Sequence, residues 1–442
     1  MNTREIALNI VYEIESKKAF SNLLINKKLK GKNATAIDRN FITEIVYGTL
    51  ENLIYIDYII TQFSSVKINK INLWTLSILR LGIYQIMFLD KVPDFAAVNE
   101  SVNLSKKYNK RTSGFINAIL RNIIRNKENI TLPDKKKDIE KYLMVKYSHP
   151  QWMVQRFLKY FDKDFTEELL KANNERPDLY IRVNTLKISI EECIGKLEGK
   201  GLKVTKCPLI KEAVIIRGIN KIEEMEEYRE GYIHIQDFGS MLVSKALEPK
   251  ESDFIIDMCC APGGKTTHIA QLMNNKGKIL ARDIYDHKLK LVEDNSSRLG
   301  VKIIHTQKFD GMKQDDTLIE KADKVLVDAP CSGLGIIRRK PEIKYRKTPD
   351  DINELMKMQF EILKNAAIYL KPGGELLYST CTIDPNENDK VISKFLEQNK
   401  NFEIVDIESS LGLSYKGIGT IQLYPNIHHT DGFFIAKLKK II

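Results

Sequence analysis

The feature that most constrains the fold is a short apolar run ending in an acidic residue, which recurs along the second half of the chain. It occurs at Phe254–Asp257, Lys278–Asp283 and Lys324–Asp328, and a fourth apolar run covers Glu375–Thr380. Strands that alternate with helical stretches predict a doubly wound, mostly parallel sheet. Ligands of such sheets bind beyond the carboxyl ends of the strands. Polar residues at those ends are therefore the first candidates for a site.

The remainder of the chain has two other patterns. Apolar residues recur at helical spacing through roughly the first 130 residues, with Asp38 as the expected N-cap of one helix. Residues 179–184 and 213–216 are strand-like between predicted helices. The fold prediction is thus multidomain: an all-α bundle over 1–140, a small bridging α+β subdomain over 141–235, and a Rossmann-like α/β domain over 236–442.

Composition limits where the chain works. Six cysteines among 442 residues, with no CxxC pair, indicate reduced thiols rather than a disulfide framework or a zinc site. The N-terminal residues lack a signal sequence, and no apolar run is long enough to span a bilayer. His428–His429 has no further ligands at metal-binding spacing, so a loop is favoured over a metal site. We expect a cytoplasmic protein without membrane or metal partners, and a monomer because no coiled-coil pattern occurs.

The charge balance suggests a nucleic-acid partner. The chain carries 69 Lys and Arg against 58 Asp and Glu, a net charge of +11. Two basic clusters stand out. They are Lys106, Lys107, Lys110, Arg111, Arg121, Arg125, Lys127, Lys135, Lys136 and Lys137, and then Arg338, Arg339, Lys340, Lys344, Arg346 and Lys347. A single charge run is usually a solvated face, but two clusters favour binding to phosphates.

A glycine turn after the first apolar run is the predicted cofactor loop. It consists of Cys259, Cys260, Ala261, Pro262, Gly263, Gly264 and Lys265. The end of this loop resembles a phosphate-binding P-loop, but Cys259 stands where that motif has its first glycine, and a dinucleotide GxGxxG motif is absent. Asp283, eighteen residues after Lys265, is placed to accept hydrogen bonds from ribose hydroxyls. The pattern favours S-adenosylmethionine over ATP.

Two cysteines follow neighbouring strands and suggest the chemistry. Asp328-Ala-Pro-Cys331 follows one strand and Ser379-Thr-Cys381 follows another. Carbon 5 of cytosine is too weak a nucleophile to take a methyl group directly, whereas thiolate addition to carbon 6 activates it. Asp328 could support the base at nitrogen 3, and a second thiol could assist release after methyl transfer. The target base must be flipped out or unpaired.

These motifs resemble the RNA cytosine-5 methyltransferases of the NOL1/NOP2/Sun family. The resemblance rests on Asp257-Met-Cys-Cys-Ala-Pro-Gly-Gly-Lys-Thr266, Asp328-Ala-Pro-Cys-Ser-Gly333, Ser379-Thr-Cys-Thr382 and Asp431-Gly-Phe-Phe434. Over its full length the chain is similar to the RsmB (Sun/Fmu) group, in which a NusB-like RNA-binding domain precedes the enzyme. Phe115-Ile-Asn-Ala-Ile-Leu-Arg121, Arg182-Val-Asn184 and Gln236-Asp237 extend this resemblance.

The resemblance assigns roles to residues. It implies that Cys381 is the nucleophile, that Cys331 assists product release, and that Asp328 faces the base. The loop from Cys259 to Lys265, with Asp283, Asp310 and Asp328, would bind S-adenosylmethionine. Cys260 stands where the family usually has alanine and is expected to be a small packing residue. The implied partner is small-subunit (16S) ribosomal RNA.

Three alternatives stay open from the sequence. The RNA substrate could be transfer RNA or 23S ribosomal RNA. The chain could be a non-catalytic NusB-like RNA-binding factor with a vestigial second half, or a P-loop ATPase. The paired cysteines and the acidic strand ends favour the methyltransferase.

Overall fold

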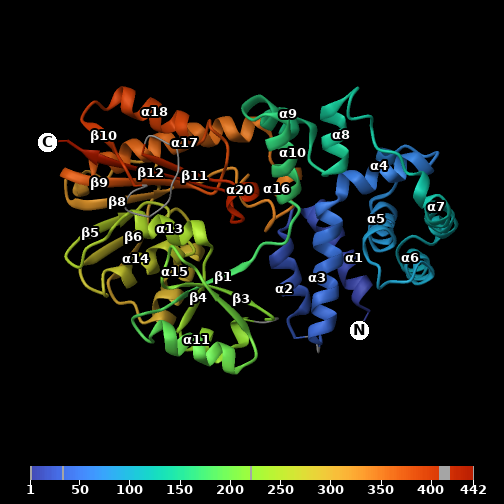
Figure 1. The fold of residues 1–442 in the computed structure, drawn as a ribbon, viewed down its shortest axis with the longest axis horizontal. Helices are drawn as coiled ribbons and strands as arrows, with labels where there is room; N and C mark the ends of the chain where they lie inside the picture. The colour runs from blue at the N-terminus through green and yellow to red at the C-terminus, as the bar shows by residue number, and fades with distance from the viewer. Residues whose placement is uncertain (1, 32–33, 220–221, 408–418, 442) are drawn as a thin grey trace. The chain divides into compact units, whose positions relative to one another are not determined.

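The computed structural model describes residues 2–31, 34–219, 222–407 and 419–441, and the chain divides into two compact units (Figure 1). The helical unit comprises residues 1–175 together with 337–347, and the α/β unit comprises 176–336 together with 348–442. The predicted multidomain architecture, with a helical N-terminal part and a Rossmann-like C-terminal part, is confirmed. The boundaries at 140 and 235 stay predictions.

The helical unit is built from amphipathic helices around one apolar core. Its helices are α1 (Thr3–Lys17), α2 (Ser21–Leu29), α3 (Ala36–Glu51), α4 (Leu53–Phe63), α5 (Leu73–Phe88), α6 (Asp94–Tyr108), α7 (Ser113–Arg125), α8 (Ile139–Lys146), α9 (Gln151–Tyr160), α10 (Lys163–Ala172) and α16 (Ile343–Arg346), with 3-10 turns at Ile68–Lys70, Lys110–Thr112 and Lys127–Asn129. Helix α5 is buried on nearly all sides, which makes it the centre of the bundle.

The predicted N-cap of α3 was wrong by three residues. Thr35 is the N-cap, and its hydroxyl accepts a hydrogen bond from the Asp38 backbone N–H at 3.1 Å. The Asp38 carboxylate in turn accepts one from the Thr35 backbone N–H at 3.0 Å. Asp38 is thus the third residue of a capping box, whose reciprocal bonds satisfy two helix-end donors.

A short segment from the second half of the sequence, residues 337–347, belongs to the helical unit. Glu342 is buried there and accepts hydrogen bonds from the backbone and hydroxyl of Ser21 at 3.0 and 3.1 Å. Lys344 is fully buried and donates to the Glu51 carbonyl at 2.8 Å and to Asn174 at 3.1 Å. Burial lowers the pKa of Lys344 to about 7. The segment is anchored by polar bonds inside the unit.

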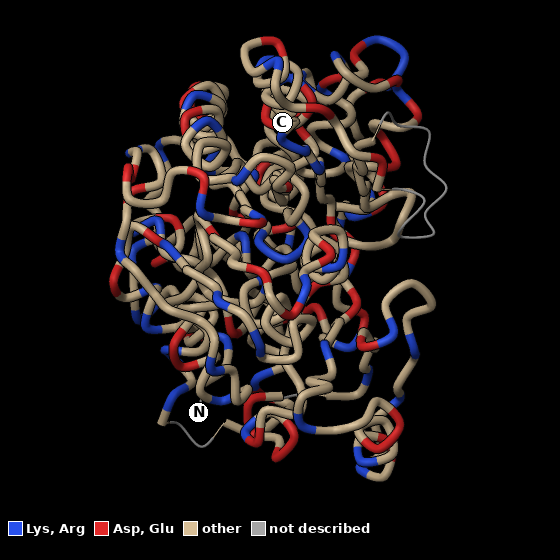
Figure 2. The backbone as a smooth tube through the Cα atoms, turned by 90° about the vertical axis from the view of Figure 1, so that its left-hand side faces the viewer, with Lys and Arg blue, Asp and Glu red and all other residues tan. Residues whose placement is uncertain are grey.

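This anchoring removes part of the second basic cluster from the surface that was predicted to bind nucleic acid. In the second cluster Arg338 and Lys344 are buried, and Arg346 donates to the Ala19 carbonyl. The first cluster is different, because Lys106, Lys110 and Arg111 are exposed. Figure 2 shows Lys and Arg positions interspersed with Asp and Glu positions along the described backbone. Arg339, Lys340 and Lys347 of the second cluster are half-buried, so the first cluster is the more exposed of the two and the better placed for phosphate contacts.

The α/β unit begins with a small antiparallel sheet, which confirms the predicted α+β segment. Its four strands lie in the order β2-β3-β1-β4. They are β1 (Leu179–Val183), β2 (Lys203–Lys206), β3 (Ala213–Arg217) and β4 (Ile233–Ile235), accompanied by α11 (Ile190–Gly199) and α12 (Glu226–Arg229). Strands β1 and β3 agree with the predicted runs, whereas the short β2 and β4 were not predicted.

The larger sheet has eight strands in the order β10-β12-β9-β8-β5-β6-β7, with β11 also paired to β12. Its elements are α13 (Phe238–Ala246), β5 (Phe254–Asp257), α14 (Gly264–Leu272), β6 (Lys278–Asp283), α15 (Asp286–Leu299), β7 (Ile304–Lys308), a 3-10 turn (Asp316–Leu318), β8 (Ala322–Asp328), α17 (Pro349–Ile368), β9 (Leu370–Thr380), α18 (Asp389–Gln398), β10 (Phe402–Val405), β11 (Thr420–Leu423), α20 (Pro425–His428) and β12 (Phe433–Lys440). Strands β5 to β9 are parallel, and β12 is antiparallel to β9.

Helices cover both faces of this sheet, as a doubly wound fold requires (Figure 1). Helices α17 and α18 pack on one face, and α13, α14 and α15 lie on the other. The chain order reverses between β5 and β8, and this switch point is where such sheets bind ligands. The acidic ends of β5, β6 and β8 all lie at the carboxyl edge, as the repeated pattern predicted.

The glycine turn predicted to precede the fourth strand lies inside that strand instead. Leu370 already pairs with Ala322 of β8, and pairing resumes at Glu375 opposite Lys324. The residues between form an irregularity in the ladder, and Gly373 adopts a positive φ of 75° there.

Candidate active site

The glycine turn after β5 is held by the buried carboxylate of Asp257. That carboxylate accepts a hydrogen bond from the Thr266 hydroxyl at 2.7 Å and one from the Cys259 backbone N–H at 3.3 Å. Gly263 caps α14 with a φ of 99°, a conformation that suits glycine. Burial raises the pKa of Asp257 to about 7. Because the Thr266 hydroxyl is buried and engaged by Asp257, it does not offer the metal ligand that a P-loop needs.

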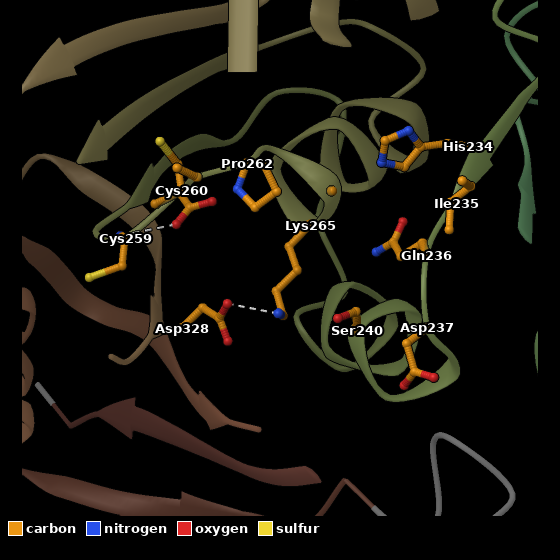
Figure 3. A pocket seen from close by; sticks show the side chains of 13 residues that line it. His234, Ile235, Gln236, Asp237, Ser240, Cys259, Cys260, Pro262, Lys265 and Asp328 are labelled. Atoms are coloured by element: carbon orange, nitrogen blue, oxygen red, sulfur yellow. Dashed lines mark hydrogen bonds and ion pairs between the residues drawn. The ribbon is translucent and has the colours of Figure 1, made fainter. Parts of the chain in front are cut away.

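A cavity of about 190 Å³ opens between this turn and the end of the small sheet (Figure 3). Six residues of the predicted cofactor loop line it, together with Asp328; the six are Cys259, Cys260, Ala261, Pro262, Gly264 and Lys265. Asp257, one of the acids at the strand ends that were expected to be functional, also lines the cavity. The other lining residues, which were not predicted as site residues, are His234, Ile235, Gln236, Asp237 and Ser240. Cofactor loop and small sheet thus face each other across one space.

Two predicted cofactor residues, Asp283 and Asp310, are not among the described residues that line this cavity. Asp283 ends β6 and accepts a hydrogen bond from the Tyr285 backbone N–H at 3.0 Å. The Cys260 N–H donates to the Arg282 carbonyl at 2.9 Å, which joins the loop to the end of β6. Asp310 follows β7 and accepts from the Met312 N–H at 3.0 Å. The carboxyl edge therefore extends beyond the cavity toward β6 and β7.

Cys260 fits the packing role that was predicted. Its side chain is buried in a small apolar cluster with Ala281, Leu289 and Val292. Burial, together with the neighbouring Asp257 and Asp283 carboxylates, raises the pKa of this thiol far above its usual range. Such a thiol stays protonated and unreactive at neutral pH.

Lys265 and Asp328 form the central ion pair of the site. The Lys265 Nζ lies 2.7 Å from the Asp328 carboxylate (Figure 3) and 5.1 Å from the centre of the Phe433 ring. The Ser379 hydroxyl donates to the second Asp328 oxygen at 2.9 Å. Burial alone would lower the pKa of Lys265, but the Asp328 carboxylate raises it above its ordinary value. The lysine therefore stays a cation.

The two predicted cysteines meet beside this pair. Their Sγ atoms are 3.3 Å apart, and both are free thiols. The hydrogen bond to Cys381, followed by burial, raises the pKa of Cys331 well above that of a free thiol. A raised pKa favours the protonated thiol at Cys331. The fold thus brings into contact two residues that lie fifty positions apart in the sequence.

A buried polar network fixes the loop that carries Cys331. Glu387 accepts hydrogen bonds from the Ser332 backbone N–H at 2.8 Å and from the Gln359 side chain at 2.9 Å. Gln359 also donates to the Pro330 carbonyl at 2.9 Å. The Ser332 hydroxyl lies 2.9 Å from the Thr382 hydroxyl, which ties the two cysteine loops together. Burial raises the pKa of Glu387. The network holds the two sulfurs in register.

The Asp-Gly-Phe-Phe tail closes the site through glycine. Gly432 donates its N–H to the Gly335 carbonyl at 2.8 Å, and a Cβ added to Gly335 would come within 2.1 Å of the Gly432 oxygen. The Gly335 N–H donates to the Cys381 carbonyl at 3.0 Å. Two backbones approach here at a distance that only glycine allows, which explains why this tail accompanies the cysteine motifs.

Two arginines that were not predicted as site residues hold this side of the cavity: Arg182 of the small sheet, which is buried, and Arg298 of α15, which is half-buried. Arg182 of β1 donates to the Gly264 carbonyl at 2.8 Å, to the Thr267 hydroxyl at 3.0 Å, and to the side chain of Gln236. Burial lowers the pKa of Arg182 to about 9. Arg298 binds His234 Nδ1 at 2.8 Å. The motifs Arg182-Val-Asn184 and Gln236-Asp237 were the available signal, and they carried no assigned role.

Among the described residues, no cluster of three or more His, Cys, Asp or Glu side chains is placed to hold a metal ion. No helix within the described part of the chain is long and apolar enough to cross a membrane.

Comparison with known proteins agrees with this arrangement. Residues 244–439 match the family described as 16S rRNA methyltransferase RsmB/F, residues 1–125 match the NusB family, and residues 149–223 match the ferredoxin-like domain of RsmF/B-like methyltransferases. A Bacillus subtilis protein, "Probable ribosomal RNA small subunit methyltransferase B", is 38% identical over 99% of both chains. The corresponding Klebsiella pneumoniae protein is 30% identical over 100% of this chain and 98% of its own.

Solved structures give the same result. The crystal structure of PH0851 has a TM-score of 0.85 at 31% identity, over 100% of this chain and 99% of that one. NSun6 from Pyrococcus horikoshii, crystallised with SFG, has a TM-score of 0.60 at 30% identity, over 66% of this chain and 98% of its own. Fold, cysteine pair and matched families define a methyltransferase that uses S-adenosylmethionine. The chain belongs to the RsmB family of ribosomal RNA small subunit methyltransferases.

The residues at the carboxyl edge fit that cofactor. The cavity contains a buried, unpartnered amide nitrogen of Gln236, a cation at Lys265 and carboxylates at Asp257 and Asp328. The turn at Gly263 and Gly264 offers backbone without side chains in the way. A polar, charged ligand with an amino-acid end is compatible with this donor and acceptor set.

Proposed function

We propose that the protein methylates carbon 5 of a cytosine in small-subunit (16S) ribosomal RNA through a covalent adduct with Cys381. The observation that carries this proposal is the 3.3 Å contact between the Cys331 and Cys381 sulfurs, beside the Lys265–Asp328 pair. Two thiols at that distance supply an attacking sulfur and a proton-transfer group in one site. The names of the relatives support the choice of RNA.

The cofactor set is proposed in the same way. Cys259 to Lys265, with Asp283, Asp310 and Asp328, would hold S-adenosylmethionine, which supplies an electrophilic methyl group when bound. Lys265 and Asp328 are proposed to serve both ligands, because their ion pair lies between the cofactor loop and the cysteines. The contact of Asp328 with Ser379 leaves its carboxylate oriented by two partners.

The steps follow from the residues. Cys381 gives up its thiol proton and attacks carbon 6 as a thiolate. Nitrogen 3 takes up a proton that Asp328 holds against it, and carbon 5 becomes nucleophilic. Once carbon 5 carries the methyl group, its proton must leave and the bond from sulfur to carbon 6 must break. Cys331, which has lost its own proton to solvent, accepts the carbon 5 proton. The electron pair of that C–H bond re-forms the double bond between carbons 5 and 6, and the sulfur of Cys381 leaves with the pair of the broken sulfur–carbon bond. Because the Glu387 network fixes Cys331, the two sulfurs keep the register that both steps need.

The test separates the two cysteines. Cys381→Ala should form no adduct and methylate no RNA. Cys331→Ala should attack and methylate but resolve slowly, so that a covalent protein–RNA complex survives denaturing electrophoresis. Full activity of Cys381→Ala, or adduct-free turnover by Cys331→Ala, would contradict the role of that cysteine.

The helical unit is proposed to bind RNA through the exposed first basic cluster. Bisulfite sequencing of RNA from cells with and without the protein identifies the target. Loss of a methylated cytosine from small-subunit RNA supports the proposal, and loss from transfer RNA or 23S RNA contradicts it. Action as a monomer in the cytoplasm is part of the same prediction and is checked by sedimentation and by cell fractionation.

A further inference from the structure

One buried donor in the cavity has no partner within the described structure. Gln236 is 5% exposed, lines the cavity, and its Nε2 atom makes no hydrogen bond. Its Oε1 atom accepts a hydrogen bond from Arg182. Because a guanidinium has only donors, the amide oxygen must face Arg182 and the NH₂ group must face away from it. Figure 3 shows that nitrogen on the side of Lys265, pointing into the cavity.

A second side chain is oriented in the same way by another arginine. His234 Nδ1 lies 2.8 Å from an Arg298 Nη atom, so this ring nitrogen must be the acceptor. Burial, followed by the charges of Arg182 and Arg298, lowers the pKa of His234 well below its usual value. A neutral ring with an accepting Nδ1 carries its hydrogen on Nε2. That atom would lie 3.6 Å from a Cβ placed on Gly264, so it sits at the start of α14.

The cavity has a positive side and a negative side. Lys265 and the uncapped N-terminus of α14 add positive potential beside the two oriented donors. Carboxylates of Asp237, Asp257 and Asp328 line the rest. A simple anion such as an RNA phosphate would face these carboxylates, whereas a zwitterion can place one charge on each side. Neither Cys331 nor Cys381 is among the described residues that line the cavity, so the attacked base lies outside the cavity.

We propose that the Gln236 amide and the His234 Nε2 hydrogen bind the carboxylate at the amino-acid end of S-adenosylmethionine. This adds two residues of the small sheet to the cofactor site, and it rests on the proposed function only for the identity of the cofactor. Arg182 and Arg298 act through these two side chains, since they fix which atom of each faces the ligand. An unpaired buried donor is costly, and the carboxylate satisfies it.

The test compares two ligands that differ at the amino-acid end. S-adenosylhomocysteine has that end, and 5′-methylthioadenosine lacks it. Isothermal calorimetry on the full-length protein should show that Gln236→Leu binds S-adenosylhomocysteine about tenfold more weakly, the usual effect of losing a hydrogen bond to a charged group. Binding of 5′-methylthioadenosine should not change. Gln271→Leu is the matched control, because Gln271 of α14 is also buried but bonds Val183 and Thr185 away from the cavity.

A second variant keeps the test decisive if Gln236→Leu does not fold. Gln236→Glu preserves the acceptor for Arg182 and replaces the NH₂ group by a second oxygen, so it should weaken S-adenosylhomocysteine more than leucine does. Equal losses for both ligands, or no loss for either, would overturn the proposal. So would unchanged cofactor affinity with a raised KM for RNA, which would assign the cavity to RNA. Failure of the unmodified protein to bind either ligand would instead count against the proposed function.

Discussion

The two edges of the large sheet carry similar ionisable residues but use them differently. At the amino edge a hollow of about 410 Å³ is lined by lysines and carboxylates that are largely paired with one another. Lys371 binds Asp323 at 2.6 Å, and Lys437 binds Glu248 at 2.6 Å and Glu375 at 3.2 Å. No described side chain that lines this hollow has a buried polar atom without a partner.

The carboxyl edge has the smaller cavity and the less satisfied polar groups. Among the described residues the amide nitrogen of Gln236 lacks a partner there. Burial raises the pKa of Asp257 to about 7, although its carboxylate accepts two hydrogen bonds. The sulfurs of Cys331 and Cys381 lie against each other at 3.3 Å. Polar groups that are fixed but not satisfied are ready for a ligand, whereas saturated ion pairs stabilise the fold. Cavity size alone would have pointed to the wrong edge.

The largest expected effect compares the two ends of strand β8. Asp328→Asn weakens the ion pair with Lys265 and the support of the base, so we expect kcat for RNA methylation to fall about 10² to 10³-fold, as when one electrostatic group is removed from an active site. Asp323→Asn makes the same chemical change at the amino end of this strand and should leave kcat unchanged. Single-turnover methylation measures both. Equal losses would show that the edges do not differ in function.

For stability we expect a substitution at the amino edge to have a large effect without a loss of activity. Lys437 is 1% exposed and holds Glu248 and Glu375, so Lys437→Met should lower the free energy of unfolding by about 2 kcal/mol, since both partners can regain water. Cofactor affinity should be unchanged. Lys439→Met, at an exposed position of the same strand, should change stability by less than about 0.5 kcal/mol. Denaturant unfolding gives both values, and a loss of activity in folded Lys437→Met would contradict the division between edges.

The sequence predicted the parts of this arrangement that follow from local pattern. Strands that end in Asp257, Asp283 and Asp328 were recognisable because each acid closes its own apolar run, and parallel pairing then places their ends at one edge. Cys331 and Cys381 were expected to meet for the same reason, and their sulfurs lie 3.3 Å apart.

The parts that depend on contacts between distant elements were not predictable. His234 lies in the three-residue strand β4, and Gln236 directly follows that strand. The Gln236 side chain is oriented by Arg182, 54 residues away in sequence, and the His234 side chain by Arg298, 64 residues away. No local signal gives the burial of Lys344 either, because a run of basic residues has the same composition whether it faces solvent or a helical core. Strands β2 and β4 of the small sheet are too short to show an alternation of apolar and polar residues.

A change in pH should alter the contributions of the two edges to stability in opposite directions. Asp257 keeps its proton in the folded state up to a pKa of about 7, while the unfolded carboxyl loses it near pH 4. Folded protein thus binds more protons over this interval, and wild-type stability falls as the pH rises. Asp257→Asn lacks this dependence, so its stability relative to wild type should increase by about 2 kcal/mol between pH 5 and pH 7.

Glu375 is the counterpart at the amino edge. Although burial opposes the effect, the lysines Lys324 and Lys437 lower its pKa, so its contribution is present above the unfolded pKa and is lost as the pH falls through the folded one. Glu375→Gln should therefore cost stability at pH 7 and progressively less below pH 4. Denaturant unfolding as a function of pH tests both variants, and parallel curves for Asp257→Asn and Glu375→Gln would contradict the comparison.

The smallest effect extends the same contrast to the helical unit, where Lys110 and Arg111 are exposed and Lys344 is buried. Replacing Lys110 and Arg111 with glutamine should reduce the slope of log affinity against log salt for RNA by about 1 to 2, since each lost phosphate contact removes about one counterion. Lys344→Met should leave that slope unchanged, because its ammonium already donates to Glu51 and Asn174. Filter binding over a salt series measures the slopes. If Lys344→Met alone flattened the slope, the buried Lys344 would have to contact RNA phosphates. The hydrogen bonds of a lysine within the protein would then not tell whether it binds RNA.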